Sequence, residues 1–244
     1  SKFLKKVKPD MVFIHGDRVE TLAAAISSSF NNFLTCHIEG GELTGTIDEH
    51  IRHSVTKLSH IHFVSNNSAK ENLLRMGENP KNVFIVGSPE VDLMKSKLPS
   101  IQEVKKRYQI SFKNYFILIF HPVTTDLKSL KKDTNLIINT LDKSNNKTIV
   151  ILPNNDPGSH LILKVYEKNK KNKNFKFIDS MRFEYFLTLL KNAELIIGNS
   201  SSGVREAPYY GTPTINIGSR QINRVNTNSI SNIFDLTEKE LIKK

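Results

Sequence analysis

The chain has 244 residues, of which 38% are hydrophobic and 8% aromatic, with a formal net charge of +11 and a single cysteine, Cys36. This length and apolar content allow one large domain or two modest ones, and no apolar run of about 18 residues is present to predict a membrane span. One cysteine excludes an internal disulfide framework and favours a reducing, cytoplasmic location.

The positive charge comes mostly from lysines scattered along the chain. The densest run, residues 168–174, contains neither arginines to read base edges nor aromatic side chains on which bases would stack. We therefore predict no nucleic-acid partner. The excess of positive charge suits a small anionic substrate instead.

Short apolar runs rich in Ile, Val and Phe recur along the chain, and helix-like segments lie between them. Such runs are typical of strands buried on both faces. Their alternation with helices predicts an α/β fold with parallel sheets and right-handed crossovers. The predicted strands are 11–16, 33–39, 61–65, 83–87, 115–121, 148–153, 175–179, 195–199 and 214–218, and the clearest predicted helices are 19–30, 68–76, 130–143 and 184–191.

A seam near residues 87–92, followed by a polar, Lys-rich stretch to Asn114, separates two series of strands. We expect a first half at residues 1–90, a second half at 91–225, and the start of a C-terminal helix at 226–244. The first residues, Ser1 to Lys6, have no Met and lack the apolar stretch of a secretory signal. We therefore expect the chain to be a piece of a longer protein.

Polar side chains follow nearly every predicted strand. Because ligands bind beyond the carboxyl ends of strands in open parallel sheets, these positions predict a site. They are His15, Asp17 and Arg18; His37 and Glu39; Ser65; Ser88; His121; Asn154 and Asp156; Asp179; Asn199 to Ser202; and Ser219 with Arg220.

The segment 37–53 combines four carboxylates, three imidazoles and one guanidinium with the paired glycines Gly40 and Gly41. It lies between a strand-like run and a helix-like run, so its titratable groups are held by rigid elements, an arrangement on which proton-transfer chemistry is commonly built. The alternative is a solvated loop with ordinary helix caps.

The segment 198–207 follows a buried strand and is rich in small residues. Small residues let the backbone approach a ligand, and the N–H groups at a helix start attract phosphate. Ser200 and Ser201 add hydroxyl donors, and Glu206 is placed to accept from ribose hydroxyls. The alternative is a run of serines that only caps a helix.

Arginine and histidine side chains add two further expectations. Arg18 and Arg220 each follow a predicted strand, where either guanidinium can clamp a phosphate or form an ordinary surface ion pair. His121 stands at a strand end before the rigid Pro122. The spacing of the other histidines matches no zinc pattern, so we predict no metal and no cofactor.

Taken together, these residues resemble the UDP-N-acetylglucosamine 2-epimerase family, in particular its hydrolysing branch. The resemblance runs in order from about residue 8 to about residue 224. It is carried by Gly16-Asp-Arg18, His37-Ile-Glu-Gly-Gly-Glu42, Thr44-Gly-Thr-Ile-Asp-Glu49, Ile51-Arg-His53, Thr56-Lys-Leu-Ser-His60, His121-Pro-Val-Thr-Thr-Asp126, Pro153-Asn154, residues 198–206, Gly211-Thr-Pro213 and Gly218-Ser-Arg-Gln221.

The resemblance implies two Rossmann-like parallel-sheet halves that face each other across a cleft, as in GT-B glycosyltransferases, with UDP held mainly by the second half. It implies a UDP-sugar substrate that is eliminated to a 2-acetamidoglucal and UDP and then hydrated to N-acetylmannosamine. Residues matching catalytic positions are Asp17, Glu39, Asp48, Glu49 and His121; those matching the UDP site are Arg18, Asn154, Ser200, Ser201, Glu206 and Arg220.

One departure is that members of the family begin with a strand and loop that would precede Ser1. We therefore expect an incomplete first half with exposed apolar edges, doubtful activity for this piece alone, and a homo-oligomer, dimer or tetramer, for the full-length protein. The alternatives are an epimerase acting on UDP-2,4-diacetamido-2,4,6-trideoxyglucose, a non-hydrolysing 2-epimerase, a GT-B glycosyltransferase, and an inactive nucleotide-binding protein.

Overall fold

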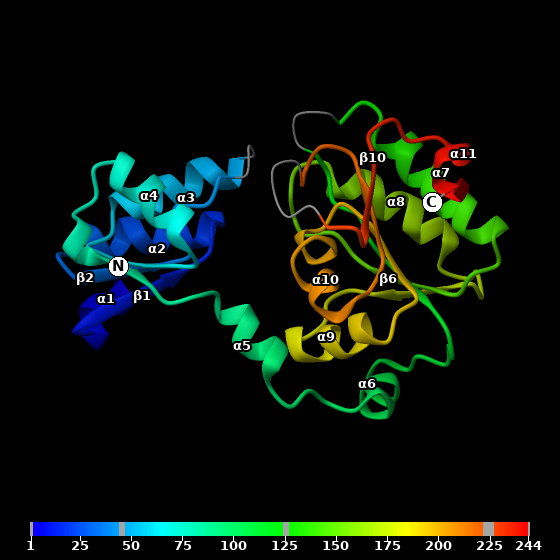
Figure 1. The fold of residues 1–244 in the computed structure, drawn as a ribbon, viewed down its shortest axis with the longest axis horizontal. Coiled ribbons are helices and arrows are strands. Elements are labelled where there is room, and N and C mark those ends of the chain that lie inside the picture. Colours follow the sequence, from blue (N-terminus) through cyan, green and yellow to red (C-terminus); the bar gives the residue numbers. More distant parts are fainter. Residues whose placement is uncertain (1, 44–46, 124–126, 222–226, 244) are drawn as a thin grey trace. The chain divides into compact units, whose positions relative to one another are not determined.

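The computed structural model describes residues 2–43, 47–123, 127–221 and 227–243. The chain folds into two compact units, Ser1–Asp92 and Leu93–Lys244. Each unit is built around its own parallel sheet with helices between the strands (Figure 1). The α/β class predicted from the alternation of strands and helices is therefore confirmed.

The first unit contains a four-stranded sheet in the order β1-β2-β3-β4. Its elements are α1 (Lys2–Val7), β1 (Met11–His15), α2 (Val19–Ser29), β2 (Leu34–Ile38), α3 (Ile47–Lys57), β3 (Ile61–Val64), α4 (Asn67–Arg75), a 3-10 turn (Pro80–Asn82) and β4 (Val83–Ile85). Each strand lies beside the next one in sequence, and right-handed crossovers then place α2, α3 and α4 on one face of the sheet (Figure 1).

That helix-covered face holds the apolar core of the first unit. The described core forms two small clusters, Ile14 with Ala25 and Val55, and Val64 with Ala69, Leu73 and Val83. The other face carries a row of aromatic rings, in which Phe63 lies 6.3 Å from Phe13 and 5.9 Å from Phe84 between ring centroids. Phe13 is 60% exposed and Phe84 48% exposed, so this face is apolar and open to solvent.

The second unit contains a six-stranded sheet in the order β10-β9-β8-β5-β6-β7. The helix α5 (Pro89–Lys95) leads into it, and its other elements are α6 (Ile101–Tyr108), β5 (Phe116–Ile119), α7 (Leu130–Lys143), β6 (Thr148–Ile151), α8 (Ser159–Asn169), β7 (Phe175–Ile178), α9 (Phe183–Lys191), β8 (Leu195–Gly198), a 3-10 turn (Ser201–Gly203), α10 (Glu206–Tyr210), β9 (Thr214–Ile217), β10 (Ile230–Ile233) and α11 (Glu238–Lys243).

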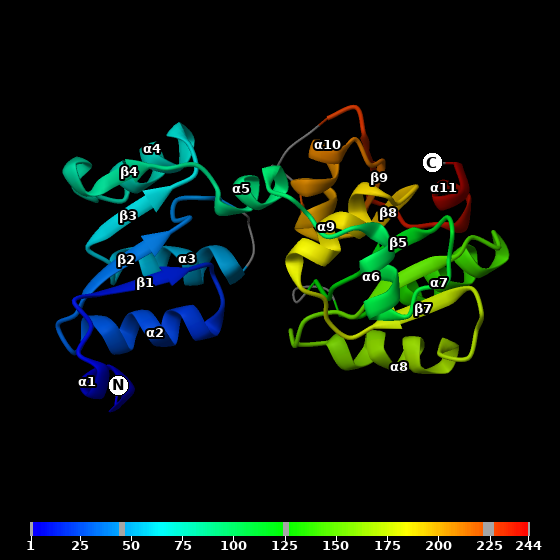
Figure 2. The same ribbon diagram turned by 90° about the horizontal axis from the view of Figure 1, so that it is seen from below.

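The strand order of this sheet reverses between β5 and β8. From β5 the chain moves outward through β6 to β7, then returns to β8 on the other side of β5 and continues to β9 and β10. The helices α7 and α8, which connect β5, β6 and β7, pack against each other, and so do α9 and α10, which flank β8 (Figure 2). Doubly wound sheets bind ligands at the carboxyl ends of the strands where the order reverses, which here is the point between β5 and β8.

All nine predicted strands are present, and each ends one or two residues earlier than predicted because the residues at its predicted end already belong to the following turn. β10 was not predicted, since its sequence Ile-Ser-Asn-Ile is short and half polar. The helix expected in residues 226–244 is α11. None of the helices in the described part of the chain is long and apolar enough to cross a membrane.

Candidate active site

Glu39 is the first residue after β2, and its backbone adopts a left-handed conformation with a φ of 64°, which is rare for a residue with a side chain. The turn continues through Gly41, where a Cβ would lie 2.3 Å from the carbonyl oxygen of Ala69. Only glycine fits there. The tight turn beside α4 therefore fixes Glu39 at the strand end, where the residue is only 8% exposed.

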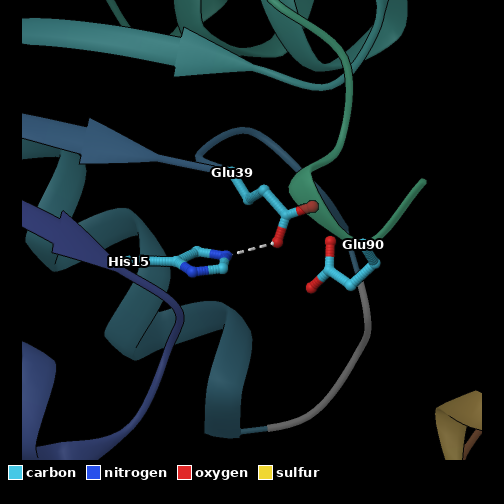
Figure 3. Close-up of side chains that lie close together, drawn as sticks. All are labelled: His15, Glu39 and Glu90. Carbon is cyan, nitrogen blue, oxygen red and sulfur yellow. Dashed lines mark hydrogen bonds and ion pairs between the residues drawn. The ribbon is translucent and has the colours of Figure 1, made fainter. Parts of the chain in front are cut away.

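The carboxyl group of Glu39 is held at both oxygens. His15 Nε2, at the end of β1, lies 2.9 Å from Glu39 Oε2, and the Ser88 hydroxyl donates to Glu39 Oε1 over 2.6 Å. The same Ser88 oxygen contacts Glu90 Oε2 at the start of α5. Figure 3 shows the side chains of His15, Glu39 and Glu90 pointing toward one another. Three strand ends and one helix start thus meet around one carboxyl.

Asp17 and Arg52 form an ion pair beside this group. Arg52 is 3% exposed, and it also donates to the backbone carbonyl of Glu42 over 2.7 Å. A buried guanidinium requires such partners, since an unpaired buried charge is costly. Arg52 therefore ties α3 to the loop after β1 and to the loop after Glu39, and it fixes the carboxylate of Asp17.

Arg18 and the acidic pair of Asp48 and Glu49 stand at helix starts. Arg18 is the N-cap residue of α2 and accepts the N–H groups of Thr21 and Leu22 at its carbonyl. Asp48 and Glu49 lie in the first turn of α3, where the helix dipole favours negative charge. Glu49 lies 3.8 Å from His53 Nε2 one turn later. Residues 44–46, which belong to the same predicted motif, lie outside the described residues.

The histidines of the first unit differ in their surroundings. Burial lowers the pKa of His37 to about 4, so its ring is neutral near neutral pH and pairs with the Thr56 hydroxyl at 3.0 Å. Burial also lowers the pKa values of His53 and His62. In the part of the chain that the structure describes, one cluster brings three possible metal-ligand atoms within 4.8 Å, and it consists of His15, Glu39 and Glu90.

In the second unit, β5 and β8 are neighbours, with Ile119 opposite Gly198. A Cβ on Gly198 would lie 1.9 Å from the carbonyl oxygen of Ile119, so this crossing needs glycine. The next residue, Asn199, is 1% exposed. Its side-chain oxygen accepts the His121 N–H at 2.7 Å, and its amide donates to the His121 carbonyl at 2.8 Å.

The ring of His121 faces the loop after β6. Its Nδ1 accepts the backbone N–H of Asn154 over 3.4 Å, and Ser159 Oγ in turn donates to the carbonyl of Asn154. His121 is 6% exposed. The backbone N–H of Asn154 thus holds the ring, while the side chain of Asn199 holds the His121 backbone. Residues 124–126 of the predicted His121 motif lie outside the described residues.

The serine loop after β8 is capped by its own side chains. Ser200 Oγ pairs with Ser202 Oγ at 2.8 Å and caps the 3-10 turn that begins at Ser201. Glu206, 5% exposed, begins the five-residue helix α10. The helix expected after the serines is therefore a 3-10 turn followed by one short helix. The dipole of so short a helix is correspondingly weak, so an anion at this loop would depend mainly on the polar groups of the loop.

Two side chains from the segment after β9 form hydrogen bonds to this loop. Arg220 donates to the backbone carbonyl of Asn199 over 3.2 Å, and Gln221 donates to the same oxygen over 2.8 Å. Asn199 therefore joins the loops after β5, β8 and β9 at the reversal point of the sheet. Gln221 is itself buried, and among the described residues its side-chain oxygen has no hydrogen-bond partner.

Sequence reasoning missed several of these residues. From the sequence, His15 and Ser88 are strand ends without a predicted role, and Glu90 belongs only to the seam near residues 87–92. Arg52 and Asn199 belong to the motifs 51–53 and 198–206, but the sequence predicts no side-chain contact for either. The strand-end rule was the available signal for His15, Ser88 and Asn199, whereas nothing local marked Glu90 as a neighbour of Glu39.

Comparison with known proteins agrees with the resemblance drawn from the sequence. The family model for UDP-N-acetylglucosamine 2-epimerase matches residues 1–243.

The chain belongs to the UDP-N-acetylglucosamine 2-epimerase family.

Two curated members of this family illustrate its range. The chain is 48% identical over 243 residues to the UDP-N-acetylglucosamine 2-epimerase of Neisseria meningitidis serogroup B, covering 96% of this chain and 64% of that protein. It is 36% identical over 227 residues to the UDP-N,N'-diacetylbacillosamine 2-epimerase (hydrolyzing) of Legionella pneumophila, covering 92% of this chain and 60% of that protein. The chain thus spans less than two thirds of either relative.

Solved structures of 2-epimerases share the fold. The Methanocaldococcus jannaschii UDP-GlcNAc 2-epimerase in complex with UDP-GlcNAc and UDP is 25% identical, with a TM-score of 0.75 over 99% of this chain and 69% of that one. The Neisseria meningitidis UDP-GlcNAc 2-epimerase bound to UDP-GlcNAc has a TM-score of 0.70 at 23% identity, covering 90% of this chain and 62% of that one. These likenesses confirm the GT-B-like pair of Rossmann-like units predicted from the sequence.

Proposed function

We propose that the chain carries the catalytic and UDP-binding residues of a hydrolysing UDP-N-acetylglucosamine 2-epimerase. The observation that carries the proposal is the carboxyl of Glu39, nearly buried, fixed by a strained backbone turn and hydrogen-bonded at both oxygens. A general base must be held in one orientation to remove a weakly acidic C–H proton. The fixed carboxyl of Glu39 supports that role.

In the proposed reaction, Glu39 takes part in proton transfer at C2 of the sugar. Loss of the C2 proton accompanies breakage of the bond between C1 and the UDP oxygen, which gives UDP and 2-acetamidoglucal. Water then adds its hydroxyl to C1, and a proton reaches C2 from the opposite face, which gives N-acetylmannosamine. Asp17, Asp48 and Glu49 are the further candidate acids, and His121 is the candidate to assist the leaving group.

UDP is assigned to the second unit. Its reversal point between β5 and β8 is where doubly wound sheets bind ligands. Ser200 and Ser201 offer hydroxyl groups there, Arg220 offers a planar cation, and Glu206 and Asn154 complete the proposed set. Arg18, the N-cap residue of α2, is proposed as a further cation for the diphosphate.

The hydrolysing reaction is favoured by relatives whose names state it. Besides the Legionella protein, the GDP/UDP-N,N'-diacetylbacillosamine 2-epimerase (hydrolyzing) of Campylobacter jejuni is 36% identical over 98% of this chain. Those two relatives also make a diacetamido-trideoxy sugar nucleotide the second candidate substrate. The greater identity to the Neisseria 2-epimerase is the reason to place UDP-N-acetylglucosamine first.

Product analysis in heavy water tests this function. The protein is incubated with UDP-N-acetylglucosamine in D2O, and the products are separated and examined by NMR and mass spectrometry. We expect free UDP and N-acetylmannosamine with one deuterium at C2. An intact UDP-N-acetylmannosamine product would indicate the non-hydrolysing reaction, and release of UDP that requires an added sugar acceptor would indicate a glycosyltransferase.

Two substitutions test whether Glu39 takes part in the reaction. Glu39→Gln keeps the side-chain shape and removes the carboxylate, so we expect UDP release to fall by about 100-fold or more. Glu78→Gln is the matched control, because Glu78 is also paired with a histidine of the first unit, at 3.1 Å from His62. Full UDP release by Glu39→Gln would remove Glu39 from the reaction. The same pair of assays with the diacetamido sugar nucleotide ranks the two substrates by kcat/KM.

A further inference from the structure

The Ser88 hydroxyl lies between two carboxyl groups. Its oxygen is within hydrogen-bond distance of Glu39 Oε1, at 2.6 Å, and of Glu90 Oε2. A serine hydroxyl carries one proton and can donate to only one of these oxygens at a time. Two ionised carboxylates would leave the other contact as an approach of lone pairs without a proton between them.

One additional proton, shared by Glu39 and Glu90, accounts for the contact to which Ser88 does not donate. If Glu39 and Glu90 together carry one proton, one carboxyl donates to Ser88 while Ser88 donates to the other carboxyl, and each contact then has a proton between its two oxygens. His15 supports this arrangement from the far side, since it occupies the other oxygen of Glu39. Carboxyl pairs that share one proton are an established device for acid–base work.

The two carboxyls differ in their access to water. Glu39 is buried at the end of β2, whereas Glu90 lies half-buried in the first turn of α5. A buried base that has accepted a proton must lose it before the next turnover. A hydroxyl bridge to a more exposed carboxyl provides that route without opening the site.

We propose that Ser88 and Glu90 form a proton relay for Glu39, in which the pair of carboxyls shares one proton across the Ser88 hydroxyl. In one direction the O–H bond of Glu90 breaks as its proton passes to Ser88 Oγ, and the Ser88 proton passes to Glu39 Oε1. One O–H bond is lost on Glu90 and one is gained on Glu39, and the negative charge moves from Glu39 to Glu90. After Glu39 has taken the C2 proton, Glu90 releases its own proton to water, and the reverse transfer then moves the proton of Glu39 through Ser88 to Glu90 and resets Glu39 as a base.

The role of the relay in turnover rests on the proposed epimerase function, but the shared proton does not. Infrared spectroscopy of the unliganded protein detects the C=O stretch of a protonated carboxyl directly. We expect this band in the unsubstituted protein at neutral pH, and we expect it to be lost in both Glu90→Gln and Glu39→Gln and kept in Glu78→Gln. Absence of the band, or its persistence in both site variants, would overturn the relay.

Kinetics then test the role in turnover. The amide introduced by Glu90→Gln can still donate to the Ser88 oxygen but cannot release a proton, so we expect kcat to fall about 10-fold or more with KM nearly unchanged. We expect a similar fall in kcat for Ser88→Ala. Ser88→Thr should keep much of the rate because it retains the hydroxyl. Circular dichroism verifies that each variant is folded. Undiminished kcat in Glu90→Gln and Ser88→Ala would reject the relay in catalysis. If the unsubstituted protein releases no UDP, the epimerase proposal fails and the infrared band still decides the shared proton.

Discussion

The side-chain amide of Asn199 closes two hydrogen bonds on the backbone of His121, one to its N–H at 2.7 Å and one to its carbonyl at 2.8 Å. The two residues are 78 positions apart in sequence, and the contact fastens the loop after β5 to the loop after β8. Because Arg220 and Gln221 both donate to the Asn199 carbonyl, one buried residue sets the geometry of three loops.

Asn199→Ala is expected to weaken UDP binding by about 10-fold or more, because it removes both hydrogen bonds that hold the His121 backbone in place. Asn199→Asp keeps one acceptor but turns an oxygen toward the His121 carbonyl, so it should not restore affinity. Calorimetric titration with UDP measures the effect. Asn216→Ala is the control, because Asn216 is also buried but bonds to Asn232 at the neighbouring strand; equal losses in both variants would contradict a specific role for Asn199.

Gly198→Ala is expected to destabilise the second unit by about 3 kcal/mol or more. The added Cβ would lie 1.9 Å from a backbone oxygen that cannot move without breaking the sheet, and the φ of 134° is unfavourable for alanine. Gly77→Ala has a similarly positive φ of 86° but meets no atom within 4 Å, so it should cost only about 1 kcal/mol. Urea unfolding of the two variants separates the effect of the close contact from that of the backbone conformation. Equal losses in the free energy of unfolding would argue against the contact with the Ile119 carbonyl.

The stability of the first unit should decrease on acidification because of His37. The His37 pKa falls from 6.5 to about 4 on burial, so between these pH values the unfolded chain binds a proton that the folded chain does not. Stability from this residue is complete above about pH 6.5, decreases as the pH falls, and levels off below about pH 4, a total on the order of 3 kcal/mol. Urea unfolding at several pH values measures it. A His37→Gln variant should show a flatter dependence, and an unchanged slope would contradict the assignment.

Two buried tyrosines of the second unit should respond oppositely to loss of their hydroxyl groups. Tyr115 OH donates to the Leu189 carbonyl at 2.9 Å, whereas Tyr166 OH is buried without a hydrogen-bond partner among the described residues. Tyr115→Phe should cost about 1 kcal/mol because the Leu189 carbonyl keeps only the Asn192 N–H as a donor, while Tyr166→Phe should be neutral or stabilising by about 1 kcal/mol. Denaturant unfolding compares the pair. A clear loss in Tyr166→Phe would indicate that its hydroxyl has a partner, such as a water molecule.

The strands of both units and the position of Glu39 were predictable from local sequence. Runs of Ile, Val and Phe specify strands, and parallel strands bring their carboxyl ends to one edge, so the sequence alone predicts His15, Glu39 and Ser88 along the same edge. The helix–strand alternation likewise indicated the α/β class. These inferences depend only on the chain within a few residues of each element.

The contacts that join distant segments were not predictable in this way. Glu90 reaches Ser88 and Glu39 because the turn after β4 leads directly into α5, which no periodicity indicates. The hydrogen bonds between Asn199 and His121 depend on β8 lying beside β5. The order of strands in a sheet cannot be predicted from any single segment of the sequence. The ion pair of Asp17 with Arg52 depends equally on how α3 packs against the loop after β1.

The two units have apolar cores of unequal size. Among the described residues, the second unit contains a cluster of sixteen buried apolar residues, whereas the described clusters of the first unit have three and four. Heating should therefore give a calorimetric trace with two peaks rather than one. The unit that holds Glu39 should melt first, so that a warmed sample loses the proposed acid–base residues while the unit proposed to bind UDP is still folded.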